Sequence, residues 1–202
     1  MHTRTLARVA RQLALVFGAA ANCAPAFSHI TAQPNEAVGG TYFQTTLNVP
    51  HGCDGSSTVA IQVAIPADVL SVKPQMKAGW RVDLQTRVIE PPLKGEHGAS
   101  ITRAVSSVEW RGGPLPDSLY DSFGLVMKLP EAAGKTLYFP VVQTCESGRR
   151  EWTEIPADGQ SWHALHSPAP FVRLKSPVAT PPVAASSTDA EPAHVHSHSH
   201  SN

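Results

Sequence analysis

Residues 58–65 read Thr-Val-Ala-Ile-Gln-Val-Ala-Ile and are followed by Pro66. Alternate residues of a β-strand point to opposite faces of the sheet, and every second residue here is β-branched. These residues are Val59, Ile61, Val63 and Ile65. Proline cannot donate to a strand ladder, so Pro66 ends the run. The stretch therefore predicts a strand that buries one face.

Similar short runs lie on both sides of this strand, and most of them end at a proline or glycine. They cover residues 41–49, 80–89, 101–110, 123–129, 136–144 and 151–155. Period-two alternation with a breaker about every ten residues is typical of two-sheet domains, and frequent Pro and Gly argue against long helices. The sequence predicts an all-β antiparallel sandwich of about seven to nine strands within residues 29–174.

Residues 1–28 have the layout of a secretory signal peptide. Three arginines precede an apolar stretch over residues 13–21, and Ala26-Phe27-Ser28 fits a small-x-small cleavage site. Cleavage after Ser28 would leave His29 as the first residue, whereas cleavage after Ala26 would leave Phe27. The apolar stretch is shorter than the ~20 residues of a membrane span. We therefore expect export to the periplasm or another extracytoplasmic space.

The charge and cysteine content fit such a destination. Without residues 1–28 the chain has 13 basic and 16 acidic side chains, a formal net charge of −3, which argues against a nucleic-acid partner. Cys23 would leave with the signal peptide. The remaining pair, Cys53 and Cys145, is expected to form a disulfide in an oxidising compartment. A pair of cysteine metal ligands is the alternative, which their wide separation disfavours.

Residues 175–202 differ in composition from the rest of the chain. They mix Pro, Ala, Ser and Thr without an aromatic residue, which is typical of a disordered tail. Four alternating histidines near the end are candidates for auxiliary metal capture: His194, His196, His198 and His200. A solvated tail and an expression tag are the alternatives.

An amino-terminal His29 would offer two nitrogen donors to one metal ion. Its free α-amine and its imidazole Nδ1 can close a chelate ring, and Cu(II) has the highest affinity for such donors among the divalent metals of its row.

Nine short sequence motifs occur one after another along residues 29–152. They are His29-Ile-Thr, Pro34–Gly40, Val49-Pro-His-Gly-Cys53, Ala78-Gly-Trp80, Val108–Gly113, Leu115-Pro116, Tyr120-Asp-Ser-Phe123, Leu137–Cys145 and Glu151-Trp152. Together they resemble the YcnI-like family of exported copper-binding domains over residues 29–174. The resemblance implies an Ig-like or cupredoxin-like β-sandwich and a Cu(II) site called a monohistidine brace.

The resemblance also implies the residues of that site. His29 would supply its amine and ring nitrogen, and Trp152 would lie near the metal. An acidic side chain completes the site in the family, often directly before the Phe of the Tyr-x-x-Phe phrase. That position is Ser122 here, so Asp121 is the first candidate for the carboxylate and Glu36 the second.

The other histidines and tryptophans are expected to be structural. His51 is interpreted as a turn residue beside the disulfide, and His163 and His166 as exposed side chains, with a second metal ligand as the less favoured reading. The remaining tryptophans are expected in core or edge packing: Trp80, Trp110 and Trp162.

The favoured function is therefore copper trafficking or tolerance, with the copper ion and other copper-handling proteins of the periplasm or membrane as partners. A metal-free structural or interaction module is the alternative. A copper-dependent oxidative enzyme is less favoured, because the sequence shows no second histidine in an obvious partner phrase. No Gly-x-Ser-x-Gly or His-Glu-x-x-His phrase occurs, so an enzyme is not expected.

Overall fold

Strands make up nearly all the regular structure of this chain. The computed structural model describes residues 29–95 and 98–177, so the predicted signal peptide and the four tail histidines lie outside the described residues. The strands are β1 Thr31–Gln33, β2 Glu36–Val38, β3 Tyr42–Val49, β4 Thr58–Ala64, β5 Ser71–Pro74, β6 Trp80–Lys94, β7 Ser100–Leu115, β8 Asp121–Lys128, β9 Thr136–Tyr138, β10 Val141–Cys145, β11 Arg149–Trp152 and β12 Phe171–Lys175.

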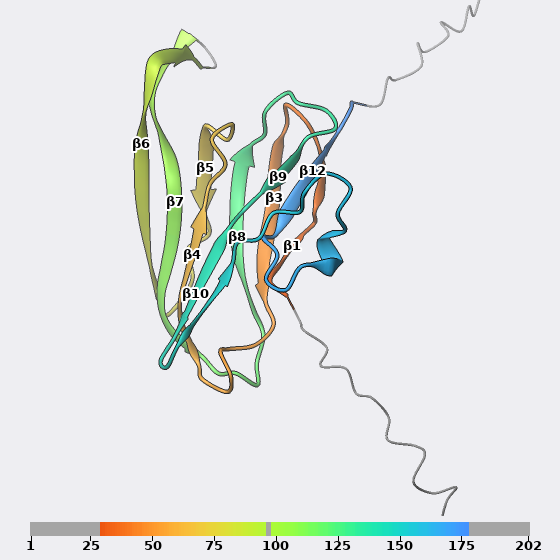
Figure 1. The fold of residues 1–202 in the computed structure, drawn as a ribbon. Helices are drawn as coiled ribbons and strands as arrows, with labels where there is room; N and C mark the ends of the chain where they lie inside the picture. The colour runs from red at the N-terminus through yellow and green to blue at the C-terminus, as the bar shows by residue number, and fades with distance from the viewer. Residues whose placement is uncertain (1–28, 96–97, 178–202) are drawn as a thin grey trace, which may run out of the picture.

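The strands form three sheets (Figure 1). One has the order β1-β3-β8-β5, the second β11-β10-β4-β7-β6, and the third β2-β12-β9. Within the alternating run of residues 58–65, Thr58–Ala64 form the central strand β4, where Ile61 pairs with Trp110 of β7 and with Gln143 of β10. Ile61, Val63 and Ile65 are buried, which confirms the predicted inward face at these three positions. Val59 is only half-buried, because the register shifts between Thr58 and Ala60.

Aromatic side chains join the two larger sheets. Phe123 of β8 lies with its ring centroid 5.4 Å from that of Trp110 and 5.0 Å from that of Trp80. Trp110 and Phe123 are fully buried, and Trp80 packs against the core from a partly exposed position. The expected packing roles of Trp80 and Trp110 are therefore confirmed.

The third sheet differs from the predicted all-antiparallel arrangement. β2 pairs with β12 in parallel, with Glu36 opposite Arg173. In addition, residues 136–144 form two strands because Pro140 interrupts the ladder. β9 pairs with β12, whereas β10 pairs with β4 in another sheet. Short strands that change sheets leave too few alternating residues for the sequence pattern to reveal.

The β6–β7 hairpin is longer than predicted and extends beyond the other strands (Figure 1). β7 continues past Gly112, which was expected to end it. A Cβ atom at Gly112 would lie 2.2 Å from the Gly79 carbonyl oxygen, so the glycine permits the close approach of the two strands. Toward the tip, Val88 and Leu93 are 57% and 43% exposed.

The predicted disulfide is confirmed. Cys53 and Cys145 are bonded, with their Cα atoms 6.0 Å apart, and the bond ties the segment before β4 to the end of β10. In residues 29–95 and 98–177, no helix has the length and apolar character of a membrane span.

Candidate metal site

His29 lies just before the edge strand β1. Ile30 is fully buried and Ala32 is nearly so, while Thr31 is half-buried, so burial alternates along the segment. By this alternation the His29 side chain lies on the outer face of its sheet, together with Thr31. It is half-buried rather than solvated.

Two tryptophans flank the His29 ring. The ring centroid of Trp152, at the end of β11, is 5.8 Å away, and that of Trp162 is 5.3 Å away. Both contacts are edge-on, with interplanar angles of 71° and 88°. The structure thus brings together His29 and Trp152. It also adds Trp162, which the sequence assigned to packing alone.

A buried hydrogen-bond network holds Trp152. Its Nε1 donates to Oε1 of Gln143 at 3.0 Å, and Gln143 is fully buried. Nε2 of Gln143 donates to the His51 carbonyl at 2.7 Å and to Oγ1 of Thr58 at 2.8 Å. The His51 ring centroid lies 6.3 Å from that of Trp152. His51 therefore helps to support the site from the turn beside the disulfide.

Trp162 belongs to a closed loop between β11 and β12, residues 153–170, which contains the short 3₁₀ helix Trp162–Ala164. Glu154 joins the two ends of this loop. Its amide donates to the Ser167 carbonyl at 3.0 Å, and its carboxylate accepts from the Ser167 amide at 2.6 Å. Trp162 Nε1 donates to the Ala169 carbonyl at 2.8 Å, which fixes the indole over His29.

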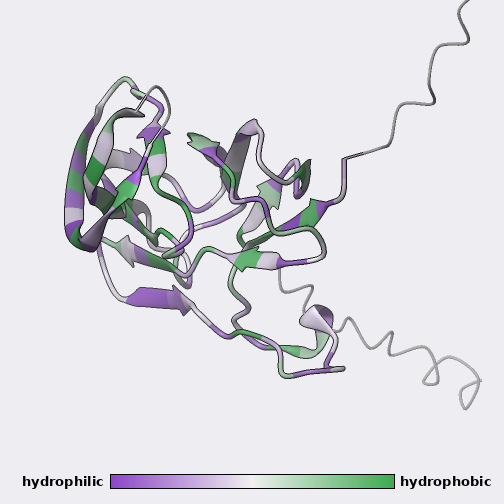
Figure 2. Cartoon of the chain, turned by 90° about the horizontal axis from the view of Figure 1, so that it is seen from above, coloured by the Kyte–Doolittle hydropathy of each residue, from purple (hydrophilic) through white to green (hydrophobic). Residues whose placement is uncertain are grey.

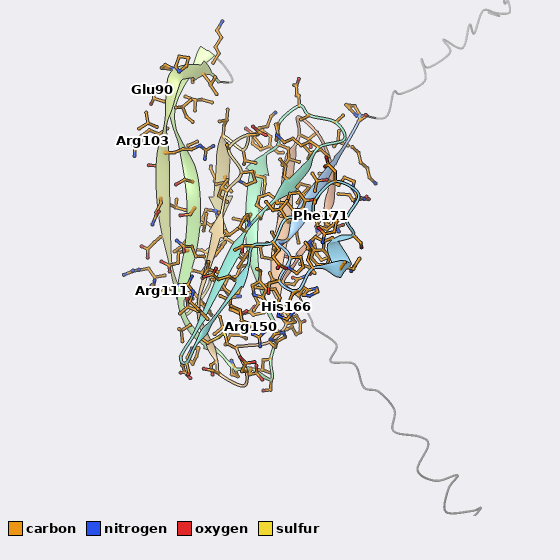
Figure 3. All side chains as sticks on the ribbon, in the orientation of Figure 1. Glu90, Arg103, Arg111, Arg150, His166 and Phe171 are labelled. Carbon is orange, nitrogen blue, oxygen red and sulfur yellow. A yellow bond between two sulfur atoms is a disulfide. The ribbon has the colours of Figure 1, made fainter. Side chains whose placement is uncertain are left out.

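The loop forms one wall of a surface depression beside His29. The depression is lined by His29, His163, Ala164, Leu165 and His166. His163 and His166 are exposed, as predicted. In Figure 3, His166 is labelled in the lower half of the molecule, and Glu90 near the tip of the β6–β7 hairpin at the top.

The surroundings lower the pKa of the His29 ring and so favour its neutral form. Burial is the main cause that lowers its pKa, and the nearby His163, His166 and His51 rings lower it further, against a hydrogen bond to the His166 backbone. Metals bind the neutral imidazole, so a lowered pKa reduces the competition from protons. The donor side chains that line the depression are imidazoles, a ligand type that suits Cu(II).

The two candidate carboxylates are held by basic partners elsewhere. Asp121 accepts from Lys77 Nζ at 2.6 Å and from the Ser122 amide at 2.8 Å. Asp121 pairs with the buried Val49, so it lies on the core side of the sheet. The side chain that shares the outer face with Thr31 is that of Ser122, because Ser122 is opposite Asn48 and Asn48 is opposite Thr31.

Glu36 lies in a different sheet from β1. Its carboxylate is 2.5 Å from Lys175 Nζ and 3.6 Å from Arg173 Nη1. The hydrogen bond from Lys175 is the main cause that lowers the pKa of Glu36. Among the described residues, no three His, Cys, Asp or Glu side chains form a group that could hold a metal. The described side chains alone thus do not make up a three-ligand site at His29, and both the amine ligand and the carboxylate ligand stay predictions.

The family model described as "Domain of unknown function (DUF1775)" matches residues 29–174, and its match begins at His29. The chain belongs to the DUF1775 family. This confirms the resemblance at the level of the family, because the YcnI-like proteins are DUF1775 proteins. No curated protein matches the chain.

A solved structure supports the same fold for the DUF1775 domain. The chain is similar to an uncharacterized protein from Nocardia farcinica whose crystal structure is described as revealing an immunoglobulin-like fold. The sequences are 26% identical, the TM-score is 0.55, and the match covers 73% of this chain and 99% of the other. The DUF1775 domain here is therefore an Ig-like β-sandwich, and neither comparison indicates a catalytic family.

Proposed function

We propose that this DUF1775 protein is exported and holds Cu(II) through its mature amino-terminal histidine, His29, for copper trafficking or tolerance. The observation that supports this most directly is the position of the His29 ring. It lies half-buried between Trp152 and Trp162, where the tryptophan network fixes its place. Cleavage after Ser28 would free the α-amine of His29, which could then bind copper together with this ring and complete the chelate.

The proposed site binds copper with little reorganisation. The Trp152–Gln143 hydrogen bond and the Trp162–Ala169 hydrogen bond hold both indoles, so the ring between them has few alternative positions. A preorganised ligand loses little conformational entropy on binding, which favours affinity. The four tail histidines would bind copper more weakly if the tail is disordered, as its composition predicts, because a disordered segment has to order around the ion.

The mass of the mature protein tests the predicted cleavage after Ser28. A calorimetric Cu(II) titration at pH 7.5 then tests copper binding. Protein that begins at His29 is expected to bind one tight equivalent. A variant with one alanine added before His29 is expected to lose it, although every side chain remains. Unchanged affinity in that variant would contradict the proposal.

Two further measurements separate the alternatives. Deletion of residues 178–202 is expected to remove weak multiple binding and to leave the tight equivalent. If the deletion abolishes the tight equivalent, the tail is the metal site. Affinity at His29 should also fall between pH 8 and pH 5, since a free α-amine has a pKa of about 7.7–8.0. Peroxide production in the presence of a reductant would favour an oxidative enzyme. Absence of copper binding would favour a structural module.

A further inference from the structure

On the outer face of the sheet, the residues that lie in register with Thr31 carry no carboxylate. In register across β1, β3 and β8, the side chains on this face are those of Thr31, Asn48 and Ser122, which offer hydroxyl and amide groups. The adjoining depression is lined by three histidines, an alanine and a leucine. Among the side chains that line this depression, only the histidines carry a donor of the kind that Cu(II) favours.

The two loop histidines have different relations to His29. The His29 ring makes its hydrogen bond with the backbone of His166. Such a bond at the second ring nitrogen is how proteins orient a metal-binding histidine while the first nitrogen binds the metal. His163 relates to the site through its side chain: Trp162 makes edge-on contacts with both rings, with centroids 5.3 Å from His29 and 5.1 Å from His163.

We propose that the His163 imidazole is a further ligand of the copper held by His29, and that the His166 backbone orients the His29 ring. This inference rests on the proposed function. It gives a site of three nitrogen atoms, one from the amine and two from imidazoles, without a carboxylate. Such a site needs only two side chains, so it agrees with the absence of a three-residue metal group among the described residues.

The loop is suited to this role because its own contacts hold it in place. The Glu154–Ser167 hydrogen bonds close it, and Trp162 binds the Ala169 carbonyl and packs on Phe171 with ring centroids 5.7 Å apart. The exposed imidazole of His163 is not a partner in these closing hydrogen bonds, and it contacts the loop through the edge of Trp162. His163 can therefore be replaced without opening the loop, and a change in copper binding would report on the ligand.

The test compares His163→Ala with His166→Ala in the mature full-length protein, loaded with half an equivalent of Cu(II). Electron spin echo spectroscopy counts coordinated imidazoles, and competition with a chelator gives the affinity. Wild-type protein is expected to show two coordinated imidazoles, and His163→Ala one. The Cu(II) affinity of His163→Ala is expected to fall by up to about tenfold, which equals about 1.4 kcal/mol of binding free energy. His166→Ala keeps the backbone group and is expected to match the wild type.

Three results would overturn the inference. They are one coordinated imidazole in the wild type, an unchanged imidazole count in His163→Ala, or loss of an imidazole in His166→Ala. If the wild type binds one tight Cu(II) equivalent through a single imidazole, the proposed function stands and only the role of His163 as a ligand is excluded. Absence of any tight equivalent in the mature wild type would overturn both.

Discussion

Strand β7 passes through two regions that differ in the number of strands paired with it. Residues 107–111 pair with β4 on one side and with β6 on the other, and Val108 there is fully buried. Residues 100–103 pair with β6 alone, and Val88, opposite Arg103, is 57% exposed. Hydrophobic and hydrophilic residues alternate along this hairpin (Figure 2).

The difference shows that alternation specifies a strand but not the burial of its apolar face. Burial requires a second layer, which the paired half of β7 has and the hairpin tip lacks. The candidate metal site lies on the supported side, because Trp152 and Gln143 belong to β11 and β10 of the same sheet. We therefore expect substitutions near the site to cost more stability than equivalent substitutions in the hairpin.

The disulfide provides the largest expected effect. Cys145→Ser removes a link across 92 residues, which is worth up to roughly 4–5 kcal/mol of unfolding free energy in the chain-entropy model. Thermal denaturation of the variant should show a clearly lower Tm. The matched control is wild-type protein in reductant, which should melt near the variant. Equal melting of oxidised wild type and variant would contradict the expected contribution of this link.

Gln143 gives the next largest effect. Gln143→Leu keeps the volume but leaves Trp152 Nε1 and the His51 carbonyl without their partner, and a buried group without a partner costs roughly 1–3 kcal/mol. Urea denaturation measures the loss. Gln85→Leu, at an exposed position of β6, is the control and should change stability by no more than about 0.5 kcal/mol. Equal effects would remove the distinction between the two regions.

A pair of valines tests the comparison within the hairpin sheet itself. Val108→Ala removes two buried methyl groups and should cost about 2 kcal/mol of unfolding free energy. Val88→Ala changes an exposed side chain and should cost less than about 0.5 kcal/mol. Both variants are measured by urea denaturation. A loss at Val88 as large as that at Val108 would mean that the hairpin is covered in solution.

Much of the fold follows from the sequence because its causes are local. The alternation in residues 58–65 predicted β4, and two cysteines in an exported chain predicted the disulfide, which the structure confirms. The parallel β2–β12 pairing could not be predicted, since β2 has only three residues and its partner lies far along the chain.

The site was predictable only in part for the same reason. A resemblance pointed to His29 and Trp152, whose rings the structure places 5.8 Å apart. The contact with Trp162 joins residues 133 positions apart through an irregular loop, which no periodicity reports. One sequence signal for Trp162 was present. This tryptophan is followed directly by His163 in a proline-containing loop, where the indole does not belong to the buried face of a strand. The basic partner of Asp121, Lys77, depends on the sheet register, which the sequence did not fix.

The smallest expected effect comes from an ion pair outside both regions. Glu36 is paired with Lys175 and Arg173 at the β2–β12 contact, and the hydrogen bond from Lys175 lowers its pKa below the usual 4.5. A carboxyl whose pKa is lower in the folded state stabilises the fold above its unfolded pKa, and this contribution disappears as pH falls through the folded pKa. Glu36→Gln should therefore be slightly less stable than wild type at pH 7, and the difference should be smaller at pH 3, below the usual pKa of 4.5. Thermal denaturation at both pH values measures this difference, and 1 M salt at pH 7 should reduce it because exposed charges are screened. A difference that persists undiminished at pH 3 would show that packing, rather than charge, makes Glu36 important.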